Sequence, residues 1–154
     1  MVKKASIFTA IIVAVLAIVV MPVMAAPPLF VHIEALEYVN TSGEVFEITG
    51  SAVESGIVCP VGTTADISIQ VAGPPEGAFR NLTILKRFTC DDSSGTFDLM
   101  LNVRLDLTTH ETIAQWRVVS GTGDYTNLHG RGYLVGIPID PGVSIFDVYD
   151  GTMN

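Results

Sequence analysis

The sequence predicts an all-β protein, with an eight-stranded antiparallel up-and-down barrel as the favoured architecture and a β-sandwich as the alternative. After the first 25 residues, apolar side chains recur with period two rather than 3.6. Turns rich in glycine, proline and aspartate separate these segments. No interval between them is long enough for a crossover helix, so neighbouring strands should run antiparallel and connect as hairpins.

Residues 1–25 are predicted to be a secretory signal peptide. A basic pair at 3–4 precedes an apolar run at 7–21, and the small-residue sequence VMA at 23–25 is typical of a cleavage site. An uncleaved anchor is the alternative, although this run is short against the roughly 20 residues that span a bilayer. We therefore expect a single barrel domain at 26–154, a secreted protein, and no stable membrane insertion after cleavage.

Eight segments carry the strand pattern. In TFDLMLNVRLDL at 96–107, six apolar side chains fall on one face: Phe97, Leu99, Leu101, Val103, Leu105 and Leu107. On a strand, this alternation gives one buried and one solvated face. The expected strands cover 29–38, 44–54, 64–71, 80–90, 95–107, 111–120, 130–137 and 143–151.

The earlier strands repeat the alternation between a core face and a polar face. The faces are Val31, Ile33 and Ala35 against His32 and Glu34, Phe46 and Ile48 against Glu47 and Thr49, and Ile67, Ile69 and Val71 against Asp66, Ser68 and Gln70. The turn sequences are NTSG at 40–43, GPPEG at 73–77, DDSSG at 91–95 and DPG at 140–142. Such short connections favour the barrel, whose closure removes the exposed edges of the sheet.

The glycine-rich stretch VVSGTGDYTNLHGRGYLVG at 118–136 invites comparison with a phosphate-binding loop. Such a loop needs a helix after the glycines, and here another strand follows, with no lysine to reach a phosphate. We therefore interpret Gly121 and Gly123 as structural residues, which take a positive φ or kink the strand at a corner of the barrel.

Further glycines lie in the returning strand. Gly130 and Gly132 are interpreted as structural, and Gly132 and Gly136 would make room for a bulky neighbour such as Trp116 or Tyr125. Trp116 alternates with the arginine that follows it, so one of the two faces the barrel interior. An inward tryptophan would belong to the core or line a pocket.

The element GTGDYTNLHGRGYLVG at 121–136 resembles the Gly-Thr-Gly-x-aromatic … x-Gly-x-Gly element of the allene oxide cyclase and dirigent proteins. The mature chain also resembles small secreted bacterial proteins described as allene-oxide-cyclase-barrel-like, which share a two-cysteine layout seen here in VCPVGT and FTCDDSSGTF. The resemblance spans most of 29–154 and implies a calycin-type eight-stranded barrel. Those families hold an oxidised fatty acid or phenoxy radicals. Their working lumen residues are not matched position by position to this sequence, so none is transferred.

Cys59 and Cys90 are expected to form a structural disulfide. In an exported chain a cysteine pair favours a bridge, and a metal site would need further Cys or His at close spacing. Closing a loop of roughly 30 residues would contribute about 3–4 kcal/mol in the chain-entropy model.

The chain is acidic, with 8 Lys and Arg against 16 Asp and Glu. Loss of Lys3 and Lys4 with the signal leaves 6 against 16, a net charge of −10. This charge repels nucleic acid and anionic lipid, so neither is an expected partner. The sequence carries no signature of an oligomeric state. Asn40 and Asn81 begin glycan acceptor patterns, which matter only in a eukaryotic secretory pathway.

No residue set shows a catalytic or metal-binding pattern. His32, His110 and His129 lack metal-ligand spacing and are interpreted as surface residues. No serine lies in a Gly-x-Ser-x-Gly elbow, and DDSSGTFD, with Asp91, Asp92 and Asp98, is interpreted as a hairpin turn rather than a calcium loop. We expect no catalytic residue, no metal and no cofactor, and the sequence leaves the ligand-binding residues unassigned.

The favoured function is a secreted, non-enzymatic barrel that binds a small apolar molecule or serves an interaction role. The alternative is a cyclase-like or isomerase-like enzyme that confines a reactive lipid or phenolic substrate. The lumen discriminates between them. A solid core excludes both, an apolar pocket without polar groups favours binding, and convergent carboxylates or arginines favour an enzyme.

Overall fold

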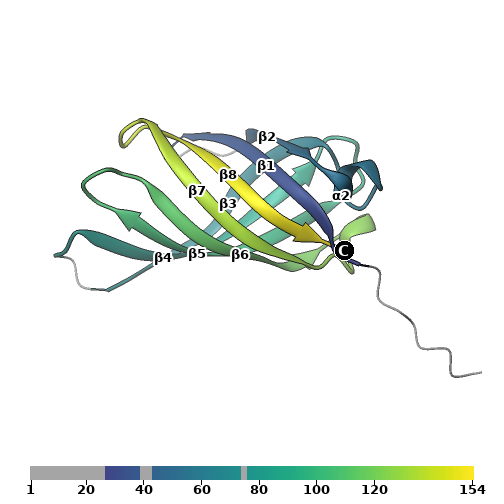
Figure 1. Cartoon of the computed structure of the whole chain (residues 1–154). Coiled ribbons are helices and arrows are strands. Elements are labelled where there is room, and N and C mark those ends of the chain that lie inside the picture. The colour runs from purple at the N-terminus through teal and green to yellow at the C-terminus, as the bar shows by residue number, and fades with distance from the viewer. Residues whose placement is uncertain (1–26, 39–42, 74–75) are drawn as a thin grey trace, which may run out of the picture.

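The chain closes into a barrel of eight antiparallel strands in the order β1 to β8 (Figure 1). This computed structural model describes residues 27–38, 43–73 and 76–154, so the predicted signal peptide and the Asn40 acceptor site lie outside the described residues. The strands are β1 Leu29–Tyr38, β2 Glu44–Thr49, β3 Val61–Ala72, β4 Phe79–Cys90, β5 Thr96–Asp106, β6 Thr112–Gly121, β7 Gly130–Asp140 and β8 Ser144–Met153.

Pairing of the first and last strands closes the sheet. β1 and β8 pair along their whole length, from Leu29 opposite Met153 to Tyr38 opposite Ser144. The predicted up-and-down barrel is therefore confirmed, and the alternative of a β-sandwich is wrong. Among the described residues, no helix has the length and apolar character needed to cross a membrane.

The predicted strand at 44–54 is wrong in its second half. β2 ends at Thr49, and a short helix α2, Ser51–Glu54, follows. Gly50 turns the chain with φ +105°, and a Cβ there would lie 2.8 Å from the carbonyl oxygen of Phe30. The backbone N–H of Phe30 donates to Ser51 Oγ at 3.0 Å, which fixes the start of the helix against β1.

The predicted core face of the strand at 64–71 is wrong, because Ile67, Ile69 and Val71 are all exposed. Asp66 is exposed, as predicted, although it also lines the cavity described below. The register of β3 against β4 shifts between Asp66 and Ser68, so that Asp66 lies opposite Lys86 and Ser68 lies opposite Leu85. A bulge places two residues of one strand against one of its partner, which changes the face that follows. As a result, Asp66 and Ile69 both line the lumen.

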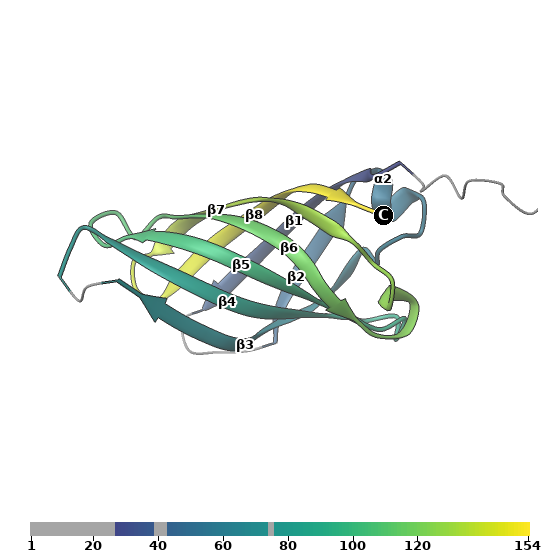
Figure 2. The same ribbon diagram turned by 90° about the horizontal axis from the view of Figure 1, so that it is seen from below.

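An aromatic cluster fills one end of the barrel. The rings of Phe88 and Phe97 stack with centroids 5.0 Å apart, and the ring of Tyr149 meets Phe88 edge-on at 5.9 Å. Phe46 and Tyr125 complete the cluster. This closed end carries α2 and the C-terminus, whereas the β3–β4, β5–β6 and β7–β8 connections lie at the opposite end (Figures 1 and 2).

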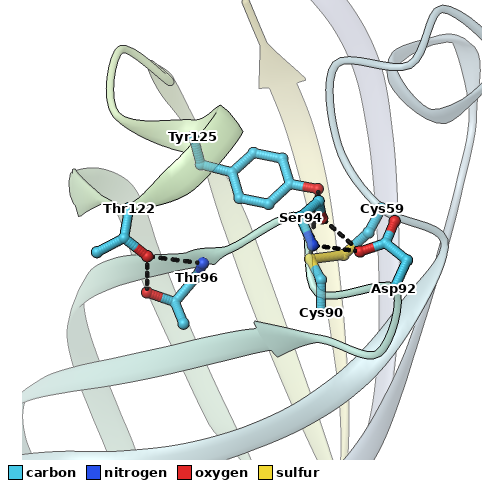
Figure 3. Close-up of a disulfide and its surroundings, with 7 residues drawn as sticks. All are labelled: Cys59, Cys90, Asp92, Ser94, Thr96, Thr122 and Tyr125. Carbon is cyan, nitrogen blue, oxygen red and sulfur yellow. Dashed lines mark hydrogen bonds between the residues drawn. A yellow bond between two sulfur atoms is a disulfide. The ribbon is translucent and has the colours of Figure 1, made fainter.

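The disulfide between Cys59 and Cys90 is present, as predicted, and ties the approach to β3 to the end of β4 (Figure 3). Beside it, Asp92 accepts hydrogen bonds from the backbone N–H and the hydroxyl of Ser94, which shapes the hairpin turn between β4 and β5. The hydroxyl of Tyr125 lies 2.6 Å from Ser94 Oγ and so joins this turn to the aromatic cluster.

Glycines pack the closed end against its neighbours. Gly123 has φ +60°, and a Cβ there would lie 2.1 Å from the carbonyl oxygen of Ser94. A Cβ at Gly121 would lie 2.1 Å from the carbonyl oxygen of Tyr125, which follows in the short helix η1, Gly123–Tyr125. A Cβ at Gly132 would lie 2.7 Å from the buried ring of Trp116. The effect of these glycines on stability stays a prediction.

Candidate functional site

A cavity of about 640 Å³ occupies the barrel beyond the aromatic cluster. Residues of the β5–β6 and β7–β8 turns, His110 and Gly142, line it, so it opens at the end opposite α2 (Figure 2). Its walls are largely aliphatic and include Leu82, Ile84, Leu101, Val103, Leu134 and Ile145. The barrel is therefore packed solid only at one end, and the other end has room for a small molecule.

Charged side chains converge on this cavity from five strands, β1 to β4 and β8. We call Glu37, Thr64, Asp66, Lys86 and Asp147 the polar cluster; they come from β1, β3, β3, β4 and β8 respectively. Strand alternation places Glu37, Lys86 and Asp147 inward, since each continues the inner face of an otherwise apolar strand. Along β4, for example, the lysine stands between two inward apolar residues, one in the cavity wall and one in the aromatic cluster.

Lys86 is held by two carboxylates. It forms an ion pair with Glu37 Oε2, and its Nζ lies 3.0 Å from Asp66 Oδ1. The side chain of Lys86 is 4% exposed. Burial alone would lower the pKa of Lys86, but the surrounding negative charges, Glu37 foremost, raise it above its ordinary value. Lys86 therefore stays charged, and its charge is directed at these two partners.

Asp147 lies in the cavity wall and makes no direct ion pair there, although the charge of Lys86 acts to lower its pKa. Burial and the negative charge of Glu37 raise its pKa to about 7. The hydroxyl of Tyr149 donates to Asp147 Oδ2 across 3.5 Å, a long contact. The pKa of Glu37 is also raised by burial, against the opposing effect of Lys86. The cavity thus contains one carboxyl group, that of Asp147, whose pKa lies near neutral pH.

Three oxygens of the polar cluster lack partners. In the part of the chain that the structure describes, the buried side-chain atoms without a hydrogen bond are Glu37 Oε1, Thr64 Oγ1 and Asp147 Oδ1. Buried polar groups are almost always hydrogen-bonded, because an unpaired one loses its hydration without compensation. All three residues line the cavity, so these atoms identify where a bound molecule or water would complete the site.

The histidines do not join the polar cluster. His32 lies on the outside of β1, where its Nδ1 is 2.7 Å from Asp150 Oδ1; this hydrogen bond raises its pKa. His110 is exposed in the turn at the cavity mouth, and His129 is exposed near the C-terminus. Within the described residues, no group of three or more His, Cys, Asp or Glu is arranged to hold a metal ion.

Two other residues that the sequence singles out lie outside the cavity. Trp116 is buried on the inner face of β6, and its indole N–H donates to the carbonyl oxygen of Tyr133 at 3.0 Å. Asp98 pairs with Arg87 through two hydrogen bonds of 2.8 and 3.0 Å and also accepts one from Ser120. Neither residue lines the cavity, which contains none of the glycines interpreted as structural.

The polar cluster is absent from the sequence-based expectations, although part of its signal is in the strand period. Glu37 lies two residues after Ala35, and Asp147 lies two residues before Tyr149, each on a face that is otherwise buried. Lys86, the only lysine after Lys4, interrupts an apolar face in the same way. A charge on the core face of a strand is a candidate functional group, because its burial has to be compensated.

Comparison with known proteins does not add a family. Neither protein-family models nor curated protein sequences gave a match to this chain. The resemblance to allene oxide cyclase and dirigent proteins therefore stays a prediction from the glycine element and the cysteine layout. The cavity and its polar cluster are what bear on the function.

Proposed function

We propose that the barrel binds a small, mainly apolar molecule in its lumen. The observation that carries this proposal is the cavity of about 640 Å³ with aliphatic walls and a few polar groups at its inner end. Ligand sites in proteins typically have about 300–1,000 Å³ and this distribution of apolar and polar groups. The aromatic cluster closes the far end, so a ligand would enter and leave through the mouth.

A neutral fluorescent probe tests this proposal. The protein is titrated with N-phenyl-1-naphthylamine, whose emission increases in an apolar site. Val103→Trp places bulk in the cavity, and we expect it to abolish the signal. Asn102→Trp is the matched control, because the neighbouring side chain is exposed on the outside of β5 and should leave binding unchanged. Equal binding by both variants contradicts lumen binding. Failure of the wild type to bind this probe contradicts it when the eight-carbon probes described below also fail to bind. Native mass spectrometry would then reveal any co-purified molecule.

A second candidate is an enzyme of the cyclase or isomerase type. Asp147 favours it, because burial raises the pKa of this carboxyl to about 7, the range in which a general acid or base works well. An isomerisation needs only a proton taken from one atom of the substrate and returned to another, so a single carboxylate suffices. The convergence of carboxylates with Lys86 in one cavity is the arrangement that favours an enzyme over a simple carrier.

Asp147→Asn separates the two candidates. Wild type and variant are produced in the same host, and the small molecules extracted from each are compared by chromatography and mass spectrometry. An enzyme would leave unreacted substrate in the variant, seen as a molecule of equal mass with a different retention time. A binding protein would carry the same molecule in both.

We also propose that the barrel works outside the cytoplasm. The predicted signal peptide supports export, and a disulfide persists in oxidising compartments. The disulfide is weaker support than the signal, since it also occurs in some intracellular proteins.

A further inference from the structure

The polar cluster has more hydrogen-bond acceptors than donors. Lys86 forms ion pairs with Glu37 and Asp66, and the hydroxyl of Tyr149 donates one long hydrogen bond to Asp147 Oδ2. Glu37 Oε1 and Asp147 Oδ1 are left without a donor among the described residues. Asp147 is 6% exposed, so bulk solvent does not compensate its free oxygen.

We propose that the ligand of the lumen is an organic ammonium ion: an apolar body that carries a protonated amine, with the amine donating to Asp147 Oδ1 and Glu37 Oε1. This inference rests on the proposed binding function and names its ligand class. An ammonium group brings three N–H donors and a positive charge in addition to those of Lys86, which are directed at Glu37 and Asp66. The apolar body would lie along the aliphatic walls toward the mouth.

The charge of the cavity favours this ligand over an anion. Three carboxyl groups, those of Glu37, Asp66 and Asp147, face one cation, Lys86, and the side chain of Glu44 also lines the cavity. Low-dielectric walls strengthen the field of these charges inside the lumen. A carboxylate ligand would be repelled and would find Lys86 already paired.

The same geometry disfavours a wholly apolar ligand and a metal ion. An apolar molecule would cover Asp147 Oδ1 and Thr64 Oγ1 without supplying a partner, which is costly for buried polar atoms. A metal ion would need several carboxylates around one point, and no such group occurs in the described ranges. An ammonium ion on an apolar body satisfies the oxygens and fills the cavity.

Three eight-carbon probes of different charge test the inference: octylammonium, octanol and octanoate. Their affinities are measured by isothermal titration calorimetry at about pH 8, where Asp147 is ionised. We expect octylammonium to bind about tenfold more tightly than octanol, because its charged N–H groups pair with carboxylates. Octanoate should bind most weakly.

Asp147→Asn and Asp150→Asn form a matched pair for this test. Both lie on β8, but Asp147 lines the cavity and Asp150 faces outward to His32. Asp147→Asn should reduce octylammonium affinity about tenfold and octanol affinity much less, because only the ammonium loses a charge-assisted hydrogen bond. Asp150→Asn should change neither. The octanol measurement also shows that each variant still folds.

The affinity for octylammonium should rise with pH. Between about pH 6 and about pH 8, Asp147 gains its negative charge, and binding of the amine at the lower pH should release a proton. The other titratable groups that face the cavity or contact Asp147 are Glu37, Tyr38, Glu44, Asp66, Lys86, His110 and Tyr149. Calorimetry in buffers of different ionisation enthalpy measures the released proton directly, and Asp147→Asn should abolish most of it.

Each outcome supports or overturns the inference. If octanol binds as tightly as octylammonium, or if N-phenyl-1-naphthylamine binds and octylammonium does not, the inference is wrong and lumen binding stands. If octanoate binds most tightly, the ligand's head group is negatively rather than positively charged, and Lys86 is its partner. If none of the four probes binds, lumen binding itself is overturned.

Discussion

A single carboxyl group, that of Asp147, gives the barrel a stability that depends on pH. Its pKa of about 7 lies above the value of about 3.9 expected in the unfolded chain. The folded protein therefore binds more protons between these values, and stability falls as the pH rises from about 4 to about 7. Ionisation of Asp147 is the unfavourable event, because its charge is buried beside Glu37.

Asp147→Asn should remove this penalty. At about pH 8 we expect the variant to be roughly 1–3 kcal/mol more stable than the wild type, and at about pH 4 nearly equal to it. Urea midpoints at the two pH values measure the difference. A variant that is less stable at pH 8 would show that the ionised carboxylate is compensated in the folded state.

Asp98→Asn is the control, because this substitution should lower the stability at pH 8 rather than raise it. Hydrogen bonds from Arg87 and Ser120 lower the pKa of Asp98, against the effect of burial. Its contribution to stability is therefore present above its unfolded pKa and is lost as the pH falls. We expect this variant to be less stable than the wild type at pH 8, with a smaller difference in strong acid.

Gly123→Ala should destabilise the closed end. Its φ of +60° disfavours a side chain, and the Cβ would lie 2.1 Å from the carbonyl oxygen of Ser94. The cost should exceed the roughly 0.4–1 kcal/mol that the substitution returns through the unfolded state. Gly56→Ala is the control, because Gly56 has φ +69° but open space around it, and it should cost less. Denaturant midpoints measure both.

The binding of N-phenyl-1-naphthylamine to folded Gly123→Ala should match that of the wild type. Gly121 and Gly123 do not line the cavity, so we expect them to shape the barrel without contact to a ligand. Normal stability with lost probe binding would assign this stretch to the ligand site instead.

Among the elements, the disulfide joins the parts of the closed end. Cys59 and Cys90 are separated by 31 residues in the sequence, and their bridge spans the β2–β3 connection and the end of β4. We expect reduction to lower the free energy of unfolding by about 3–4 kcal/mol, chiefly through the entropy of the unfolded chain. Urea unfolding with and without reductant measures this change. Alkylation of both cysteines in the native, unreduced protein would contradict the bridge.

The strand period predicted most of the elements but not their irregular positions. β1, β5 and β8 follow from alternation alone, because each pairs over its length with a regular neighbour. Gly50 ends β2 early through a close approach to Phe30, which is distant in the sequence. The shift at Asp66 depends on the register with β4. The alternation of apolar residues within one strand does not indicate either feature, because both depend on contacts with another strand.

At the scale of the whole molecule, closure follows from eight similar strands with short connections, and the sequence shows both. The polar cluster does not follow in the same way, because it depends on which strands are neighbours and in what register. Glu37 and Asp147 are 110 positions apart in the chain, yet β1 pairs with β8 and brings them to one wall. Sequence alternation indicates the inward charges singly, and only closure brings them together.

The mature chain should begin near Ala26 in the exported protein. The apolar run at 7–21 and the VMA sequence before Ala26 predict cleavage there. N-terminal sequencing of the extracellular protein checks this expectation. Recovery of membrane-bound material that retains Met1 would contradict it and favour the uncleaved anchor.

The burial of Lys86 has a practical consequence for anyone who handles this protein. After Lys4 the sequence has no other lysine. If the signal peptide is cleaved as predicted, amine-directed crosslinkers, dyes and surface couplings would reach the protein almost solely at its new N-terminal amine. Attachment there would leave the barrel mouth free, since β1 begins at the closed end. Slow modification of Lys86 would instead measure how often the barrel wall opens and exposes this side chain. Hydrogen exchange measures the same kind of local opening at backbone amides. The reactivity of Lys86 toward amine reagents is therefore a measure of how often the lumen opens.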